Sequence, residues 1–138
     1  MGGLNRIYRV WTAVIVVAVL VQIGAAGYGA FYASEKADPG PITHQAWDHG
    51  WNFHKAFGYI LFYAAIVLFG LAVIGRFPRK RVLEITGLPL LIAAQIGLAA
   101  GGESIPAIGV FHPLVAFLIL GFAGRLAFEA GWKPRRRG

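Results

Sequence analysis

Apolar residues run along the chain in four long stretches that contain no Asp, Glu, Lys or Arg. These stretches are residues 10–34, 56–75, 85–102 and 104–124, and they hold 25, 20, 18 and 21 residues. Each is about as long as a helix must be to cross a ~30 Å hydrocarbon core, and none alternates apolar with polar residues as membrane-barrel strands do. The pattern predicts an all-α membrane protein with four transmembrane helices, over about residues 8–33, 46–76, 82–102 and 105–130.

The two halves of the chain repeat one short pattern. In the first half, Gln22 and a run of small residues precede a loop and a Phe-His pair that ends at His54. In the second half, Gln95 and a similar run precede a shorter loop and a Phe-His pair that ends at His112. Because the order is the same, the sequence predicts a single domain, residues 1–138, built as an up-down bundle from two similar helical hairpins. The glycines expected to let helix backbones approach closely are Gly24, Gly27, Gly29, Gly97, Gly101 and Gly102.

Basic residues are concentrated at one end of the predicted bundle. Of the 13 lysines and arginines, only Lys36 and Lys55 lie in segments on the opposite side. The positive-inside rule then places both termini in the cytoplasm, and we expect a multi-pass protein of a bacterial-type inner membrane. The formal net charge of +7 indicates this orientation and contact with anionic membrane lipid, rather than nucleic-acid binding.

Several kinds of chemistry are excluded by what the chain does not contain. It has no cysteine, so it has no disulfides, thiolate metal sites, iron–sulfur ligands or covalently attached c-type haem. It also has no phosphate-binding loop, no G-x-S-x-G and no H-E-x-x-H motif. Any redox or group-transfer chemistry would therefore come from a bound cofactor, and the sequence leaves open whether the protein is an enzyme.

Two histidines lie inside predicted spans, where ionisable residues usually mark a functional site. His54 and His112 each lie near the outer end of an even-numbered helix, so they can face each other in an up-down bundle. Two neutral imidazoles from facing helices are the usual axial ligands of a b-type haem. Gly58 and Ala116, one helical turn further along, leave room for a flat porphyrin. The sequence therefore predicts one haem b between the second and fourth helices, with His54 and His112 as iron ligands. The alternative is that the two histidines are separate polar contacts, hydrogen-bonded to Gln22, Gln95 or the backbone.

Other residues are expected near this site. Gln22 and Gln95 carry amides within apolar spans, and they either line the cofactor pocket or join helices by hydrogen bonds; the sequence leaves both interpretations open. The ammonium of Lys55 would lie at the outer rim, where it can contact the haem propionates. The aromatic residues expected around the porphyrin edge are Phe53, Phe57, Phe62 and Phe111. The remaining histidines, His44 and His49, are expected on the surface, where they could also contact the propionates.

The last helix is expected to continue past its charge-free stretch as far as Gly131. Arg125 follows His112 by only 13 residues, or ~20 Å of helix, which is too short to reach the inner boundary from the level of His54. A longer helix gives both histidines the same depth and places Trp132 at the interface. Arg125 then lies inside the helix, paired with Glu129 four residues on.

With these features, the chain resembles one half of a haem A synthase. That family has two four-helix bundles, each with histidines on its second and fourth helices flanking a haem, and His54 and His112 match those positions. The resemblance covers the layout from about Tyr8 to Gly131 and implies a haem-binding bundle. The chain is also similar to small bacterial four-helix membrane proteins with "HxxxG" and "LHP"-like motifs, matched here by His54–Gly58 and by Phe111-His112-Pro113.

Three functions follow from these observations. The first is a membrane cytochrome that transfers electrons to or from a quinol or a partner subunit. The alternative is a non-catalytic accessory subunit of a larger respiratory or photosynthetic membrane complex, with structural histidines or one histidine that ligates a chlorophyll magnesium. The third is a small transporter with a polar path through Gln22, Gln95 and Glu84. The oligomeric state stays open.

Overall fold

The computed structural model describes residues 3–37 and 40–131, which are helical over almost their whole length. The helices are α1 (Gly3–Lys36), α2 (His44–Ile74), α3 (Arg79–Ser104), the short α4 (Pro106–Gly109) and α5 (Phe111–Gly131). α1, α2, α3 and the segment Pro106–Gly131 are each long and apolar enough to cross a membrane. The predicted all-α fold with four membrane-spanning helices is therefore confirmed for the described residues.

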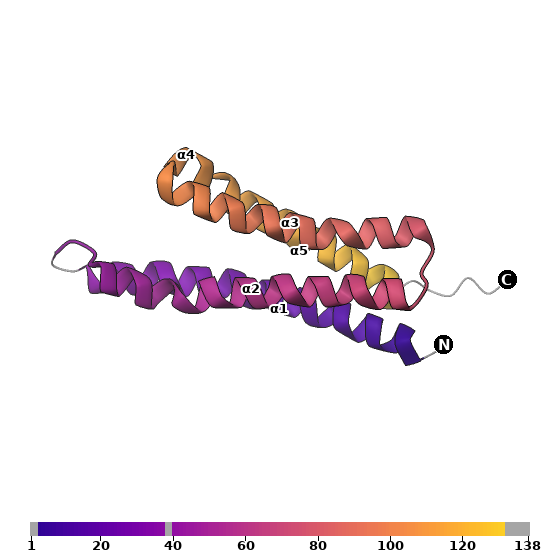
Figure 1. Cartoon of the computed structure of the whole chain (residues 1–138). Helices are drawn as coiled ribbons and strands as arrows, with labels where there is room; N and C mark the ends of the chain where they lie inside the picture. Colours follow the sequence, from indigo (N-terminus) through magenta and orange to yellow (C-terminus); the bar gives the residue numbers. More distant parts are fainter. Residues whose placement is uncertain (1–2, 38–39, 132–138) are drawn as a thin grey trace.

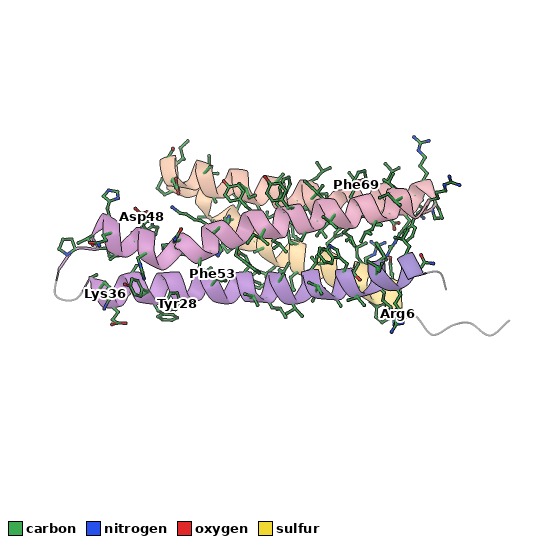
Figure 2. All side chains as sticks on the ribbon, turned by 60° about the horizontal axis from the view of Figure 1, so that its bottom comes forward. Arg6, Tyr28, Lys36, Asp48, Phe53 and Phe69 are labelled. Atoms are coloured by element: carbon green, nitrogen blue, oxygen red, sulfur yellow. The ribbon has the colours of Figure 1, made fainter. Side chains whose placement is uncertain are left out.

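The long helices run alternately up and down in a four-sided bundle (Figure 1). α1 and α3 each pack against both α2 and α5, so α2 and α5 are diagonally opposed. The α2–α3 connection, the start of α1 and the end of α5 share one end, which we call the arginine end because it holds Arg6 (Figure 2) and Arg81. The other end holds α4, Lys36 and Asp48 (Figures 1 and 2), and we call it the histidine end.

The buried positions of the two hairpins coincide. Every residue in the following two sets is at most 5% exposed. Thr12, Ile15 and Val19 of α1 recur 73 positions later as Ile85, Leu88 and Ile92 of α3. Leu61, Ala65 and Leu68 of α2 recur 58 positions later as Ile119, Ala123 and Leu126 of α5. The hairpins thus contribute equivalent faces to one core, as the repeated sequence pattern predicts.

The bounds of α2 follow from local signals. Thr43 caps its start, since the threonine hydroxyl accepts a hydrogen bond from the Ala46 amide at 3.2 Å. At its end the chain turns through a left-handed residue, Arg76, with φ 50°. The Phe77 amide then donates to the Ala72 carbonyl at 3.0 Å, which is the long bond of a Schellman motif.

The fourth span differs from the prediction in its first turn. Ile105 has an extended backbone with φ −132° and ψ 97°, because the ring of the following Pro106 disfavours helical angles in the residue before it. This residue therefore separates α3 from the short α4, and Val110 lies between α4 and α5. The end of α5 at Gly131 agrees with the expected long helix, and Arg125 donates to Glu129 at 3.0 Å as expected. Trp132 and the basic residues after it lie outside the described residues.

Only some of the glycines bring helix backbones together. A Cβ at Gly29 would lie 2.9 Å from the Gly50 carbonyl oxygen, so α1 and α2 cross in contact there. A Cβ at Gly102 would lie 2.7 Å from the Cα of Gly109, and one at Gly101 would meet Ile108. The expectation was wrong for Gly24, Gly27 and Gly97, where a Cβ would meet nothing within 4 Å. Gly24 and Gly97 are exposed, and Gly27 is half-buried.

Arg81 joins three helices at the arginine end. Its guanidinium donates to Glu84 on α3 at 3.2 Å, to Glu129 on α5 and to the Tyr8 hydroxyl on α1 at 3.4 Å. Arg125 also bonds Glu129, and the side chains of Arg81, Glu84 and Glu129 are only 18–29% exposed. Since the charges balance and come from separate helices, this network fixes α1, α3 and α5 to one another.

Candidate functional site: two histidines and a cavity

His54 and His112 meet at the histidine end, although α2 and α5 lie on a diagonal of the bundle. Their ring centroids are 6.1 Å apart and their ring planes are inclined by 66°. Both residues are half-buried. The two imidazoles therefore lie at the same level of the bundle, because α5 continues beyond Arg125 to Gly131.

Each histidine is held by the glutamine of its own hairpin through two hydrogen bonds. In the first hairpin, Nδ1 of His54 lies 3.1 Å from the Gln22 backbone carbonyl oxygen, and the Gln22 amide Nε2 donates to the His54 carbonyl at 2.8 Å. In the second hairpin, the corresponding distances between His112 and Gln95 are 3.0 Å and 2.7 Å. The same reciprocal pair of bonds thus forms twice, at equivalent positions.

These bonds require a proton on Nδ1 of both rings. A backbone carbonyl oxygen can only accept a hydrogen bond, so Nδ1 of each imidazole must carry the proton. In the neutral form of such a ring, Nε2 carries the lone pair, and this is the form in which histidine binds a metal ion. Histidines that ligate metals commonly donate their other nitrogen to a backbone carbonyl in this way. The sequence interpretation of the glutamines as helix-joining residues agrees with these contacts.

Burying the polar side chains of Gln22 and Gln95 at these positions costs free energy that packing alone does not offset. Oε1 of Gln22 and Oε1 of Gln95 are buried and have no hydrogen-bond partner in the described part of the chain. A buried acceptor without a partner costs ~1–3 kcal/mol, whereas leucine at the same place would leave no such atom. Packing therefore does not explain these residues, and the Nε2 of each donates to the backbone carbonyl of a histidine.

A cavity of about 370 Å³ lies between the two hairpins at this end, where the hairpins diverge (Figure 1). Its volume is in the range of small-molecule sites, ~300–1,000 Å³. His54, His112, Gln22, Gln95, Gly58, Ala116 and Lys55 all line it. The structure therefore brings all seven residues that the sequence proposed for the cofactor site to one cavity.

Most of the cavity wall consists of equivalent pairs from the two hairpins. The pairs are Val19 and Ile92, Gln22 and Gln95, Ile23 and Ile96, Ala26 and Ala99, His54 and His112, Lys55 and Pro113, Gly58 and Ala116, Tyr59 and Phe117, and Leu61 and Ile119. The members of a pair lie 73 positions apart when they belong to α1 and α3, and 58 positions apart when they belong to α2 and α5. The buried core positions are related by the same two spacings. The cavity thus lies where the equivalent surfaces of the two hairpins face each other.

Lys55 forms an ion pair at the edge of the cavity. Its Nζ lies 3.6 Å from Glu103 Oε1, and the two side chains are 48% and 69% exposed. Both residues line the cavity, Lys55 from α2 and Glu103 from α3. Lys55 was predicted from the sequence and Glu103 was not, because only the fold brings the end of α3 beside this part of α2.

The aromatic residues of the cavity wall are also different from those expected. Tyr59 and Phe117 line it, whereas none of the four phenylalanines chosen from the sequence does so among the described lining residues. Trp51 contacts the His54 ring edge-on, with centroids 5.4 Å apart. The spacing of Tyr59 and Phe117, each five residues after a histidine, is the signal that would have found them.

The other two histidines lie apart from the cavity. His44 is exposed in the first turn of α2, and His49 lies against Tyr32 with ring centroids 5.1 Å apart. Within residues 3–37 and 40–131, no group of three or more histidines and carboxylates is arranged to hold a metal ion. His44 and His49 therefore provide controls for experiments on His54 and His112.

Comparison with known proteins assigns the chain to a family. Residues 22–101 match the model of a family of unknown function, DUF6220. The chain belongs to this family. The match begins at Gln22 and includes His54 and Gln95, so it contains three of the four members of the two histidine–glutamine pairs. No curated protein and no solved structure matches the chain.

Proposed function

We propose that this DUF6220 member is a membrane cytochrome that binds one b-type haem between α2 and α5 and transfers electrons. The observation that carries the proposal is the pair of imidazoles 6.1 Å apart, each with Nδ1 bonded to a backbone carbonyl and Nε2 left as a ligand atom. A haem iron held by two histidines changes between ferric and ferrous states and thereby carries one electron. The layout is also the one that the resemblance to haem A synthase implies.

The dimensions of the site support this ligand. Two imidazoles that bind one metal ion from opposite sides have ring centres ~6 Å apart, because a metal–imidazole bond is ~2.0 Å long. Rings that share such an axis can take any angle to each other, so the 66° between the planes of His54 and His112 is compatible with ligation. Gly58 and Ala116 keep the wall thin beside each histidine. The otherwise mostly apolar cavity suits a macrocycle with apolar faces.

The residues of the chain have separate parts in this proposal. His54 and His112 bind the iron, and the backbone carbonyls of Gln22 and Gln95 hold their protons at Nδ1. The amides of the two glutamines fix the histidine backbones from the neighbouring helices. Lys55, at the exposed edge of the cavity, supplies a positive charge for the propionates.

An absorption spectrum tests the proposal most directly. The chain purified from haem-replete cells should have a sharp Soret band, and dithionite should produce a narrow α-band. His54→Ala and His112→Ala should each abolish the reduced six-coordinate spectrum, whereas the matched variants His44→Ala and His49→Ala should keep it. A colourless preparation, or a spectrum that survives the loss of either cavity histidine unchanged, would contradict a haem bound by both.

We also propose that the arginine end faces the cytoplasm of a bacterial-type inner membrane. Arg76, Arg79, Lys80 and Arg81 lie at or beside the α2–α3 connection at this end, and such residues favour the cytoplasmic side. Because the chain has no cysteine, single introduced cysteines report orientation cleanly. A membrane-impermeant maleimide applied to intact spheroplasts should label Gln45→Cys and not Lys80→Cys. Labelling of Lys80→Cys alone would reverse the orientation.

A further inference from the structure

The two halves of the cavity wall are equivalent in position but not in polarity. Lys55 on α2 corresponds to Pro113 on α5. Glu103 on α3 corresponds to Ala30 on α1, which carries no charge. The Lys55–Glu103 ion pair therefore lies on the α2–α3 side of the cavity and has no equivalent on the α1–α5 side.

The cavity also reaches the surface on this side. Among the described lining residues, those that are exposed are Lys55, Tyr59, Ala99, Ala100 and Glu103 on α2 and α3, and Pro113 and Phe117 on α5. The lining residues of α1 are buried or half-buried. The opening thus lies mainly between α2 and α3, with Tyr59 at 54% exposure on its wall and the ion pair at its outer rim.

An opening between membrane-spanning helices faces lipid over most of its height. A ligand that uses it must therefore dissolve in the membrane, and its polar part must match a rim that carries one ammonium and one carboxylate. A hydroquinone has this chemistry, because its ring and tail are apolar and its two hydroxyl groups form hydrogen bonds. We propose that the α2–α3 opening binds the head of a membrane-dissolved hydroquinone, with the Glu103 carboxylate accepting a hydrogen bond from a hydroxyl group.

The proposed chemistry rests on the haem proposed above as electron acceptor. A hydroquinone that becomes a quinone gives up two electrons and two protons. With haem held by His54 and His112, ferric iron would be the electron acceptor, and two one-electron equivalents of it would be needed for each hydroquinone. The protons pass to the Glu103 carboxylate and from there to water, since this side chain is 69% exposed. Lys55 Nζ lies 3.6 Å from Glu103 Oε1 at the same rim.

Photo-crosslinking tests the binding site without using the haem. The protein in lipid vesicles is irradiated with a photoactivatable quinone analogue, and the labelled residues are mapped by mass spectrometry. Labels should fall on the α2–α3 wall, at Lys55, Tyr59 and residues 99–103, and an excess of unlabelled quinone should remove them. The equivalent α1–α5 wall serves as an internal control. Equal labelling of both walls, or labelling that excess quinone does not reduce, would overturn the proposal.

Kinetics then test the part assigned to Glu103. Haem-loaded protein is mixed with a short-chain hydroquinone, and reduction is followed at the α-band. Glu103→Gln should slow reduction at least about tenfold, as expected for the loss of a proton acceptor, while dithionite reduces the variant normally. The matched variant Glu35→Gln, from an exposed ion pair at the same end, should react like the unaltered protein. Equal rates for both variants would overturn the role of Glu103, whereas a colourless protein would contradict the haem alone, since crosslinking still reports the opening.

Discussion

Gly58 and Ala116 occupy equivalent positions beside the two histidines, and comparing them indicates how much space the site requires. A Cβ at Gly58 would lie 3.1 Å from the Gln22 amide nitrogen. In the other hairpin, Ala116 has a Cβ at this position while the Gln95 amide keeps its 2.7 Å bond to the His112 carbonyl. Alanine at position 58 should therefore be accommodated by a small shift of the amide.

The first prediction follows from this comparison. Gly58→Ala should keep the haem spectrum and change the free energy of unfolding by less than ~1 kcal/mol. Gly58→Leu and Ala116→Leu should abolish haem binding while the chain stays helical, because the larger side chain fills the cavity beside a ligand. Gly97→Leu, where a Cβ would meet nothing within 4 Å, is the control. Haem retained by both cavity leucine variants would show that the macrocycle does not lie between the histidines. Absorption and circular dichroism of the purified variants provide the measurements.

The glutamine side chains give a second prediction. The acceptor for each histidine proton is the backbone carbonyl of the glutamine, which remains when the side chain is replaced. Gln22→Leu and Gln95→Leu should each lose one interhelical hydrogen bond, worth ~0.6 kcal/mol on average in membrane proteins, and each removes a buried oxygen without a partner. We therefore expect the free energy of unfolding to stay the same or to rise by up to ~2 kcal/mol, with an unchanged haem spectrum. A variant that folds but loses its haem would show that the amide itself contacts the ligand. Denaturant unfolding in detergent, with Gln45→Leu on the exposed start of α2 as control, measures the change.

Helices α1 and α2 are held together by the crossing at Gly29 and Gly50. A Cβ on either residue would lie 2.9 Å from the other's carbonyl oxygen. This distance is shorter than a van der Waals contact, so a larger side chain must push the helices apart. The crossing lies one helical turn from His54 and therefore also sets the distance between α1 and that histidine.

The third prediction compares two glycines of α1. Gly29→Val should destabilise the protein by ~1–3 kcal/mol, the usual cost of overpacking, and should weaken haem binding because His54 moves with α2. Gly24→Val should change the free energy of unfolding by less than ~0.5 kcal/mol, since a Cβ there meets nothing within 4 Å. Thermal unfolding in detergent compares the two variants. Equal stability of both would mean that the close crossing does not hold the hairpin together.

A fourth prediction concerns the end of α2. Arg76 has φ 50°, in the region where residues other than glycine lose ~1–2 kcal/mol. Arg76→Gly should therefore stabilise the protein by about 1 kcal/mol. Lys80→Gly, inside the first turn of α3, should instead lower the free energy of unfolding, because glycine costs up to ~1 kcal/mol within a helix. Stability changes of the same sign in both variants would contradict this account of the turn.

The helices were foreseeable from the sequence for one reason: lipid requires long uncharged stretches, and charged residues mark their bounds. The order of Gln22 and His54, repeated by Gln95 and His112, also indicated the duplicated hairpin. The break before α4 could have been inferred, because Pro106 disfavours helical angles in Ile105. The pattern of small residues was less informative about which helix faces touch. A Cβ at Gly24 or Gly97 would meet nothing within 4 Å, whereas one at Gly29 would meet α2. Which face of a helix is covered depends on tertiary packing and not on the residue type.

Contacts across helices were beyond the reach of the sequence. Position along a helix gives the depth of a residue, but it does not say which carbonyl on another helix lies opposite. Bonds from the histidines to Gln22, Gln95 or the backbone were one interpretation of the sequence, but the atoms that pair needed the fold. The pair formed by Lys55 and Glu103 needed it as well. The match in depth of His54 and His112 was foreseen only by assuming that the last helix continues to Gly131.

The two ends of the bundle are built in opposite ways. At the histidine end the hairpins diverge around a cavity, and the one ion pair of its wall is exposed. At the arginine end Arg81 draws together α1, α3 and α5 with balanced charges. Because the hairpins separate around the cavity at the histidine end, the contacts at the arginine end are expected to hold the two hairpins together. The ionic network is therefore expected to matter more for stability than a surface ion pair would.

The fifth prediction tests this division. Arg81→Met leaves Glu84 and Glu129 close together with only Arg125 to compensate them, and it should cost ~2 kcal/mol or more, because removing one partner of a shielded ion pair leaves uncompensated charge. The triple variant Arg81→Met, Glu84→Gln, Glu129→Gln should recover part of this loss, since it removes the uncompensated carboxylates as well. Lys36→Met breaks the exposed pair with Glu35 and should cost less than ~0.5 kcal/mol.

Denaturant unfolding of the same three variants in one detergent gives the comparison, and the haem spectrum of each folded variant should stay unchanged because Arg81 lies at the end opposite the cavity. If Arg81→Met costs no more than Lys36→Met, the arginine end does not hold the hairpins together. The core positions shared by α1, α2, α3 and α5 would then have to do so alone. If Arg81→Met unfolds at normal stability but loses its haem, the two ends are coupled, and the spacing of the hairpins at the cavity depends on charges at the far side of the membrane.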